Sequence, residues 1–266
     1  MNLDYNVADG VATITINNPP VNVFTPELHQ QFAGLLRSFL ADDTVRVGIL
    51  TGAGQRAFCA GDDIKTERPV RTHAELVRRH MSVRHEAESL EYPGWEKEVM
   101  LLGLRRYKPI IAAVNGVVMG QGMVYLMHLT DIRIASSTAR FGLPEIAYGM
   151  GGAGGSTRLE HQIPPVAAMW LALTGEPFDA EAALRYNLVN EVVQPEELMS
   201  RAREVAALIA RHPALAVRTE MEAISRTRDM TKEQTLEYIG NLYRLQRVAF
   251  GTEMPLAGKR VPSTVN

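Results

Sequence analysis

The residues best suited to chemistry lie around Gly120-Gln121-Gly122, just after a short apolar segment. Residues 110–114 read Ile-Ile-Ala-Ala-Val and predict a strand that is buried on both faces. Asn115-Gly116 then turns the chain, and the glycines open an apolar stretch that predicts a helix. This arrangement aims free backbone N–H groups at an anion or oxyanion, because glycines allow close approach and a helix N-terminus carries partial positive charge. On its own the pattern is also typical of purely structural turns.

The same region raises the question of a membrane span. Residues 109–129 contain no Asp, Glu, Lys or Arg over about the length of a span. The segment nevertheless contains Asn115, Gln121, His128 and several glycines, in a strand-turn-helix order. We therefore interpret it as the interior of a globular protein and expect no membrane partner.

Composition narrows the class of protein. With 266 residues, the chain can form one large domain, or one domain with an appendage, and 46% hydrophobic residues argue against disorder. A net charge of −2 gives no electrostatic basis for binding nucleic acid or an anionic membrane surface. The single cysteine, Cys59, excludes an intramolecular disulfide and a multi-cysteine metal site. It suits a reducing compartment, and the first ten residues lack a secretory-signal pattern, so we expect a cytoplasmic protein.

Several predicted elements must position the glycine-rich turn. Residues 11–17, 45–51 and 131–135 predict strands. Thr25-Pro26-Glu27 has the cap, the first-position proline and the first-turn acid of a helix start, and an apolar stripe follows at residues 32–39.

The rest of the chain predicts mainly helices. Residues 66–92 are rich in Arg, His and Glu and indicate a solvated amphipathic helix or a flap. From about residue 190 the pattern is wholly helical, with one helix beginning near Pro195, a second at about residues 213–227 and a third after a Thr231/Gln234 capping box. Their apolar stripes need a surface to pack on. A neighbouring subunit is the natural candidate, and packing on the same chain stays open.

Three motifs occur in a fixed order: FCAGDDI at residues 58–64, AVNG at 113–116 followed by Gly120-Gln121-Gly122, and FGLPEI at 141–146 leading to glycines at 151–155. They resemble the enoyl-CoA hydratase/isomerase (crotonase) family, and the likeness runs from about residue 11 to residue 260. The resemblance implies an α/β fold, a crotonase-like spiral of ββα units with a C-terminal helical trimerisation region.

The same resemblance implies a division of the chain and an assembly. Residues 1–190 would form the spiral core with the acyl-CoA site, and residues 191–266 would form the helical oligomerisation region. The expected assembly is a homotrimer or a homohexamer built as a dimer of trimers.

By this resemblance, the carbonyl oxygen of an acyl-CoA thioester is held by the backbone N–H groups of Asp62 and Gln121. Gly61 and Gly120 precede these two residues. A thioester that exchanges a proton at its α-carbon passes through an enolate, whose oxygen two fixed amide dipoles stabilise. Losing one such donor typically costs about 10²–10³ in rate.

The family's hydratases use two glutamates, and this sequence keeps one. Glu145 matches the second glutamate, and Val124 stands where the first would be. A valine can neither hold a water nor exchange a proton, so we expect slow hydration of a simple 2-enoyl-CoA. The pattern looks like the family's Δ3,Δ2-enoyl-CoA isomerases and hydroxycinnamoyl-CoA hydratase-lyases, which keep mainly the second glutamate. The carboxylate of Asp62 is a further candidate for a second group.

The remaining expectations concern coenzyme A, which is part of the substrate; neither a separate cofactor nor a metal is predicted. Four positions match coenzyme A contacts of relatives: Ala57, Ala60, Lys65 and Lys259. Lysines suit phosphates, although a lysine is also typical of solvated surface. The loop around Gly152 is one residue shorter than in relatives and lacks their proline, so the acyl preference stays open.

Three functions remain open from the sequence. The leading one is an isomerase or hydratase/lyase in which Glu145 is the single acid/base. A decarboxylase or thioester hydrolase would rely mainly on the oxyanion hole. A catalytically silent acyl-CoA-binding subunit would have lost activity with the glutamate absent at Val124, and the retained Glu145 argues against it.

Overall fold

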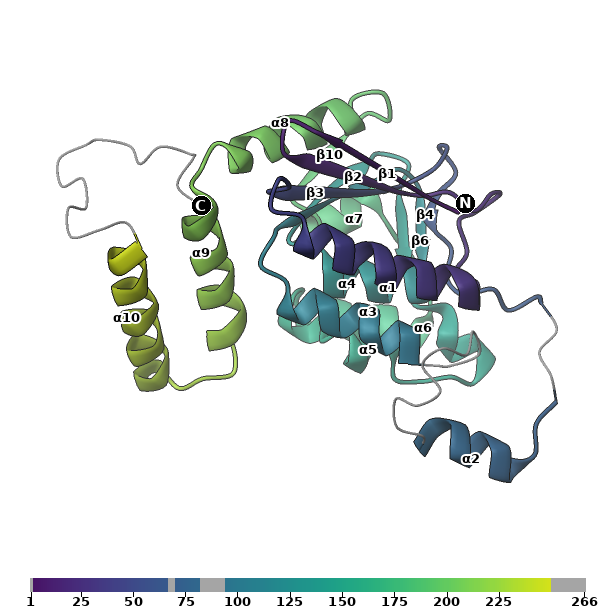
Figure 1. Cartoon of the computed structure of the whole chain (residues 1–266). Helices are drawn as coiled ribbons and strands as arrows, with labels where there is room; N and C mark the ends of the chain where they lie inside the picture. The colour runs from purple at the N-terminus through teal and green to yellow at the C-terminus, as the bar shows by residue number, and fades with distance from the viewer. Residues whose placement is uncertain (1, 67–69, 82–93, 250–266) are drawn as a thin grey trace.

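The computed structural model describes residues 2–66, 70–81 and 94–249 and contains two β-sheets with helices packed around them (Figure 1). The first sheet has the order β1-β2-β3-β5-β7-β10. Its strands are β1 (Leu3–Ala8), β2 (Val11–Ile16), β3 (Val47–Gly52), β5 (Ile110–Val114), β7 (Ile132–Ser136) and β10 (Glu191–Val193). Apart from the antiparallel pair β1/β2, all pairs in this sheet are parallel.

The second sheet is smaller and has the order β4-β6-β8-β9. Its strands are β4 (Ala57–Cys59), β6 (Val117–Met119), β8 (Arg140–Gly142) and β9 (Phe178–Asp179). Three times in succession, a strand of the first sheet leads into a strand of the second: β3 to β4, β5 to β6 and β7 to β8. Helices follow each pair, which confirms the predicted spiral of ββα units.

The helices are distributed along the whole chain. They are α1 (Pro26–Ala41), α2 (His73–Met81), α3 (Gly94–Arg105), α4 (Gln121–Leu129), η1 (Pro144–Tyr148), α5 (Ala153–Ser156), η2 (Leu159–His161), α6 (Pro165–Thr174), α7 (Ala180–Arg185), α8 (Leu198–Ala210), α9 (Ala214–Thr227) and α10 (Lys232–Ala249). Residues 109–129, the candidate membrane span, form β5, β6 and α4. None of the helices described is long and apolar enough to cross a membrane.

The predicted start of α1 is confirmed. Thr25 caps the helix by accepting a hydrogen bond from the Leu28 N–H at 3.2 Å, and Pro26 is the first helical residue. The apolar stripe is buried at Phe32, Leu36 and Phe39, where it joins the main hydrophobic core.

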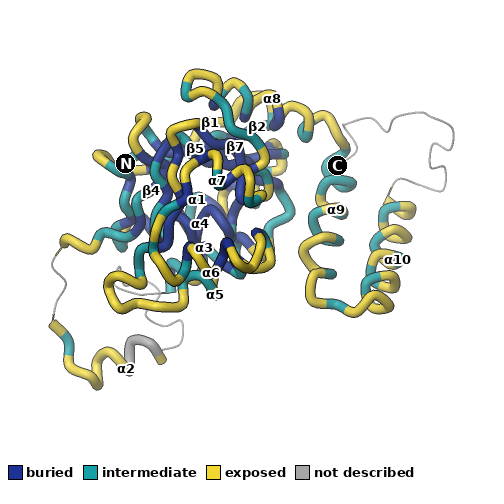
Figure 2. The backbone as a smooth tube through the Cα atoms, turned by 180° about the vertical axis from the view of Figure 1, so that it is seen from behind, coloured by how far each residue is buried: buried dark blue, intermediate teal, exposed yellow. Residues whose placement is uncertain are grey.

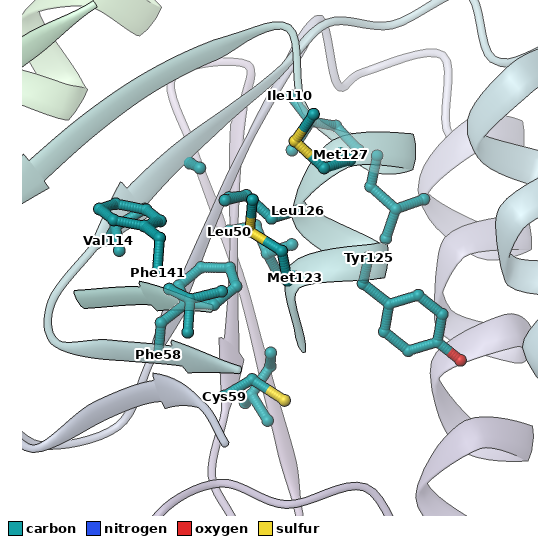
Figure 3. Close-up of a cluster of buried hydrophobic side chains, with 14 of the residues drawn as sticks. Leu50, Phe58, Cys59, Ile110, Val114, Met123, Tyr125, Leu126, Met127 and Phe141 are labelled. Carbon is teal, nitrogen blue, oxygen red and sulfur yellow. The ribbon is translucent and has the colours of Figure 1, made fainter. Parts of the chain in front are cut away.

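Helix α4 and strand β5 lie at the centre of that core. All five residues of β5 are buried, as expected for a parallel strand covered on both faces. Figure 3 shows Met123, Leu126 and Met127 of α4 packed with side chains from several strands. The glycine-rich turn that precedes α4 is therefore held between buried elements of the core.

The prediction of a wholly helical segment after residue 190 is wrong at one place, because residues 191–193 form β10. This strand pairs in parallel with β7, from Glu191 opposite Ile134 to Val193 opposite Ser136. Helix α8 then buries Leu198, Ala202 and Ala206 against β3, β5 and β7. The division predicted at residue 190 stays a prediction, but β10 and α8 pack with the preceding core.

The final helical hairpin differs from the rest of the chain. The predicted capping box at its second helix is confirmed: the Thr231 N–H donates to Gln234 Oε1, and the Gln234 N–H donates to Thr231 Oγ1. Neither α9 nor α10 contains a buried residue. Figure 2 shows this hairpin standing away from the blue core, with exposed and intermediate residues along both helices.

Candidate active site

Two glycine turns from different repeats meet at the ends of β4 and β6. Gly61 follows β4 with φ +104°, and Gly120 follows β6 with φ +53°. A Cβ atom on Gly61 would lie 3.2 Å from the Met119 carbonyl oxygen and 3.7 Å from the Gln121 nitrogen. Glycine is therefore required at both positions by backbone conformation, and Gly61 by close approach as well.

The two turns bring together the amides predicted to form the oxyanion hole. Phe24 donates to the Gly61 carbonyl and accepts from the Asp63 N–H, each at 2.8 Å, so the Asp62 N–H lies outside this pairing. Gln121 is the first residue of α4, where a helix N–H has no intrahelical partner. Neither amide donates a hydrogen bond to another residue within the described ranges. Both are thus available to a ligand oxygen.

Glu145 lies directly beside this pair of turns. A Cβ atom on Gly120 would be 3.1 Å from Glu145 Oε1, and the other carboxylate oxygen, Oε2, is buried without a hydrogen-bond partner in the part of the chain described. Burial raises the pKa of Glu145, and the negative charge of Asp62 raises it further. A half-buried carboxyl group with an unused oxygen and a raised pKa is suited to take up and release a proton.

A chain of buried polar side chains supports Asp62, and sequence reasoning missed two of its members. His29 Nε2 lies 3.0 Å from Asp62 Oδ1, and His29 Nδ1 lies 2.5 Å from the Tyr125 hydroxyl. His29 is 4% exposed and Tyr125 is 1% exposed. One sequence signal was available: His29 precedes Phe32 by three residues and therefore continues the apolar stripe of α1.

Gln121 lies next to this chain of side chains. Burial raises the pKa of Tyr125 well above its ordinary value, and the side-chain amide of Gln121 acts in the opposite direction. Gln121 Nε2 is nevertheless buried without a hydrogen bond of good geometry to any residue described. The side chains of both predicted oxyanion residues thus lie along the same polar chain.

The residues around His29 include one set that could hold a cation. Within the described ranges, only His29, Asp62 and Glu96 place three ligand atoms within 4.8 Å of one another. His29 Nε2 is 3.0 Å from Asp62 and 3.7 Å from Glu96. The shorter distance is that of a hydrogen bond. These contacts are those of a hydrogen-bonded cluster, and the expectation of no metal stays a prediction.

The predicted coenzyme A contacts lie in different environments. The Ala57 carbonyl accepts hydrogen bonds from Asn22 and Asn115, and Ala60 donates its N–H to the Val21 carbonyl, so the fold already uses these groups. Lys65 is exposed. The contacts with coenzyme A stay predictions.

Three further residues are predicted to bind the substrate: Gly152, Val124 and Lys259. Gly152 is exposed and has a φ of +109°. Val124 is 5% exposed on α4, one turn after Gln121. Lys259 lies outside the described residues.

Comparisons with known proteins identify a family for nearly the whole described fold. The sequence model of the family described as enoyl-CoA hydratase/isomerase matches residues 6–247. An (E)-benzylidenesuccinyl-CoA hydratase of Thauera aromatica is 34% identical over 93% of this chain and 91% of its own length, and a carnitinyl-CoA dehydratase of Salmonella arizonae is 33% identical over 86% and 82%. The crystal structure of an enoyl-CoA hydratase subunit I from Geobacillus kaustophilus has a TM-score of 0.81 and 28% identity, covering 98% of this chain and 97% of that one.

Proposed function

The chain belongs to the enoyl-CoA hydratase/isomerase family, and from this premise we propose that it moves a proton at the α-carbon of an acyl-CoA thioester. In this reaction the N–H groups of Asp62 and Gln121 hold the thioester oxygen while it gains enolate character. Glu145 supplies or removes the α-proton. The single observation that carries the proposal is the position of Glu145 beside Gly120, the residue that precedes the Gln121 amide.

The electrostatics of the site support this assignment. An enolate oxygen needs donors that are already aligned, because reorienting water or side chains would cost energy during the reaction. The two donors are backbone groups fixed by turns that only glycine can form comfortably. Burial raises the pKa of Glu145, so this carboxylate takes up a proton more readily than an exposed glutamate does.

Two net reactions use the same step. An isomerase would return the proton from Glu145 to the γ-carbon, and one carboxylate suffices. A hydratase or lyase would add or remove water at the β-carbon, which the names hydratase and dehydratase of two relatives favour. Decarboxylation or thioester hydrolysis would rely on the amides and would not need Glu145.

The experiment compares wild type with Glu145→Gln on a panel of CoA thioesters: 2-enoyl, 3-enoyl, hydroxycinnamoyl and malonyl. Mass spectrometry follows their consumption, and solvent-deuterium exchange at the α-carbon of butyryl-CoA follows the proton step alone. We expect the variant to lose exchange and turnover while its affinity for acyl-CoA stays within several-fold. Turnover that persists within tenfold would remove Glu145 from the mechanism. A wild-type enzyme that binds butyryl-CoA without exchange would instead indicate a silent binding subunit.

The proposal extends to coenzyme A recognition and to the compartment. Lys65 and Lys259 would contact the phosphates of coenzyme A. Lys259→Ala should therefore weaken acyl-CoA binding without unfolding the protein. Lys65→Ala should weaken binding for the same reason, and the two affinities can be compared. Unchanged affinity in Lys259→Ala would make this lysine ordinary surface. The single, buried cysteine supports a cytoplasmic location.

A further inference from the structure

We propose that the Asp62 carboxylate is a second proton-handling group of this site, positioned by hydrogen bonds through His29 and Tyr125. The inference rests on the proposed function. Val124 stands where the family's hydratases have their first glutamate, and Asp62 would supply the second carboxylate that chemistry with water needs. Asp62 would then contribute twice: its N–H to the thioester oxygen and its side chain to proton transfer.

The hydrogen bonds have a defined direction. An ionised carboxylate only accepts, so His29 Nε2–H donates to Asp62 Oδ1. A neutral histidine then has Nδ1 as its acceptor, which takes the Tyr125 O–H at 2.5 Å. Within the described ranges Asp62 Oδ2 accepts no hydrogen bond, so it can take a water or a proton.

Aromatic packing holds the two supporting rings in place. His29 stacks on Phe24 with ring centroids 4.9 Å apart, and Tyr125 meets the same ring edge-on at 5.0 Å. Phe32 contacts Tyr125 from another side at 5.6 Å. Figure 3 shows the Tyr125 ring extending away from the other labelled side chains of the core, with its hydroxyl at the far end. Since each ring has a fixed orientation, the hydrogen bonds that leave it are fixed as well.

Exposure changes sharply along this chain of side chains. His29 and Tyr125 are almost completely buried, whereas the side chain of Asp62 is 32% exposed. Burying a polar group costs free energy unless the group is hydrogen-bonded. The hydrogen bonds among His29, Tyr125 and Asp62 therefore offset the cost of burying the two rings. A rigid buried support that ends in one accessible carboxylate is the arrangement of a base held by an orienting group.

Glu145 and Asp62 can divide acid and base roles. Burial raises the pKa of Glu145 and the negative charge of Asp62 raises it further, which suits Glu145 to the acid role. The Asp62 carboxylate takes a proton from water as the water oxygen bonds to the β-carbon of a 2-enoyl thioester, and the electron pair of the double bond shifts to form the enolate. The α-carbon then takes the proton of Glu145. The product carries the H and OH of one water, and proton transfer from Asp62 to Glu145 through solvent restores both groups.

The test compares crotonyl-CoA hydration with α-proton exchange of butyryl-CoA. Asp62→Asn should reduce hydration about 10²–10⁴-fold, the usual effect of one general acid or base, while exchange falls less than hydration. Glu145→Gln should lose both. Asp63→Asn is the matched control, because its carboxylate accepts from the Lys65 and Thr66 N–H groups and lies one residue away. Hydration by Asp62→Asn at the level of Asp63→Asn would overturn the proposal.

His29 is tested as a positioning residue. His29→Phe should lower kcat for hydration about 10- to 100-fold, the effect of losing a hydrogen bond to a charged group, with KM changed only several-fold. The acidic limb of its pH–rate profile should move to higher pH, because the ionised carboxylate loses a donor. His29→Gln, which retains a donor, should recover part of the rate. An unchanged pH profile in His29→Phe would contradict the positioning role.

Within the described residues, the titratable groups that face or interact with Asp62 are His29 on α1, Glu96 on α3, Tyr125 on α4, Cys59 on β4 and Glu145 on η1, and each can affect the pH profile. Hydration that is lost in EDTA and restored by zinc would overturn the proposal in favour of a cation. Absence of exchange in wild type would overturn the proposed function itself, so the two failures are distinguishable.

Discussion

Gly120 and Glu145 fit together so closely that a Cβ atom on the glycine would lie 3.1 Å from Oε1 of the glutamate. Gly120 also has a φ of +53° and a ψ of −125°, a conformation that other residues adopt only under strain. Gly120 therefore fixes both the position of the Gln121 N–H and the space that the Glu145 carboxylate occupies.

Gly120→Ala should consequently damage catalysis more than folding. Backbone strain should lower the free energy of unfolding by about 1–3 kcal/mol. Displacement of Glu145 should lower α-proton exchange roughly 10- to 100-fold, the scale of a small misplacement at a reactive centre. Thermal unfolding and exchange rates measure the two effects. Gly34→Ala on α1 is the control, since its Cβ would meet open space; an equal loss of exchange there would contradict the argument.

The raised pKa of Glu145 predicts a pH-dependent stability difference. Burial makes the ionised carboxylate less favourable in the folded state, so Glu145 contributes stability below its ordinary pKa of 4.5 and loses that contribution as pH rises through the folded-state pKa. Relative to Glu145→Gln, wild type should therefore be more stable at pH 4 than at pH 7. Urea unfolding of both proteins at the two pH values measures the difference. A difference that grows with pH would mean that the carboxylate is stabilised as an ion.

Cys59 should be inert in the folded protein. Burial raises the pKa of its thiol to about 12, so almost none is thiolate at neutral pH. Its sulfur also packs against Gly122, where a Cβ atom would come within 2.9 Å of it. A thiol reagent such as DTNB at pH 8 should react only after guanidinium is added. Rapid reaction of the native protein would show that this strand opens readily.

Local signals in the sequence were sufficient for several elements. The cap of α1 and the capping box of α10 are set by residues within three positions of each other, so they could be read directly. The strand β10 could not, because its three residues are a strand only through pairing with β7.

In the candidate site, too, some residues could be predicted from the sequence and others could not. Glycines, Glu145 and the absence of a carboxylate at Val124 are visible in the motifs. The partners of Asp62 are not, since His29 lies 33 residues before it and 96 residues before Tyr125. A pair so distant in sequence is brought together only by the spiral of the fold.

The exposed apolar side chains of α9 and α10 predict assembly. Ile224 and Leu236 are each 64% exposed, and Val248 is 80% exposed. We expect a trimer or hexamer by sedimentation at micromolar concentration, because association would remove such residues from water. Leu236→Glu should shift the protein toward monomer, whereas Glu233→Gln on the same helix should not. A wild-type monomer would contradict the prediction.

Val124 provides a test of how the site replaces its missing glutamate. The motifs alone predict slow hydration of crotonyl-CoA, and the contact between Asp62 and His29 changes that expectation. If Asp62 supplies the second carboxylate, Val124→Glu should not accelerate wild-type hydration. It should lower stability, because a carboxylate would enter a position that is only 5% exposed.

The double variant Asp62→Asn/Val124→Glu gives the sharper result. A glutamate one helical turn from Gln121 can bring a carboxylate back to the same reacting atoms, so it should recover part of the hydration lost in Asp62→Asn. Val124→Gln in the same background has nearly the same shape without the charge and should recover nothing. Equal recovery by glutamate and glutamine would show that position 124 acts through packing. Acceleration of the wild type by Val124→Glu would show that Asp62 does not fill the role of the missing group.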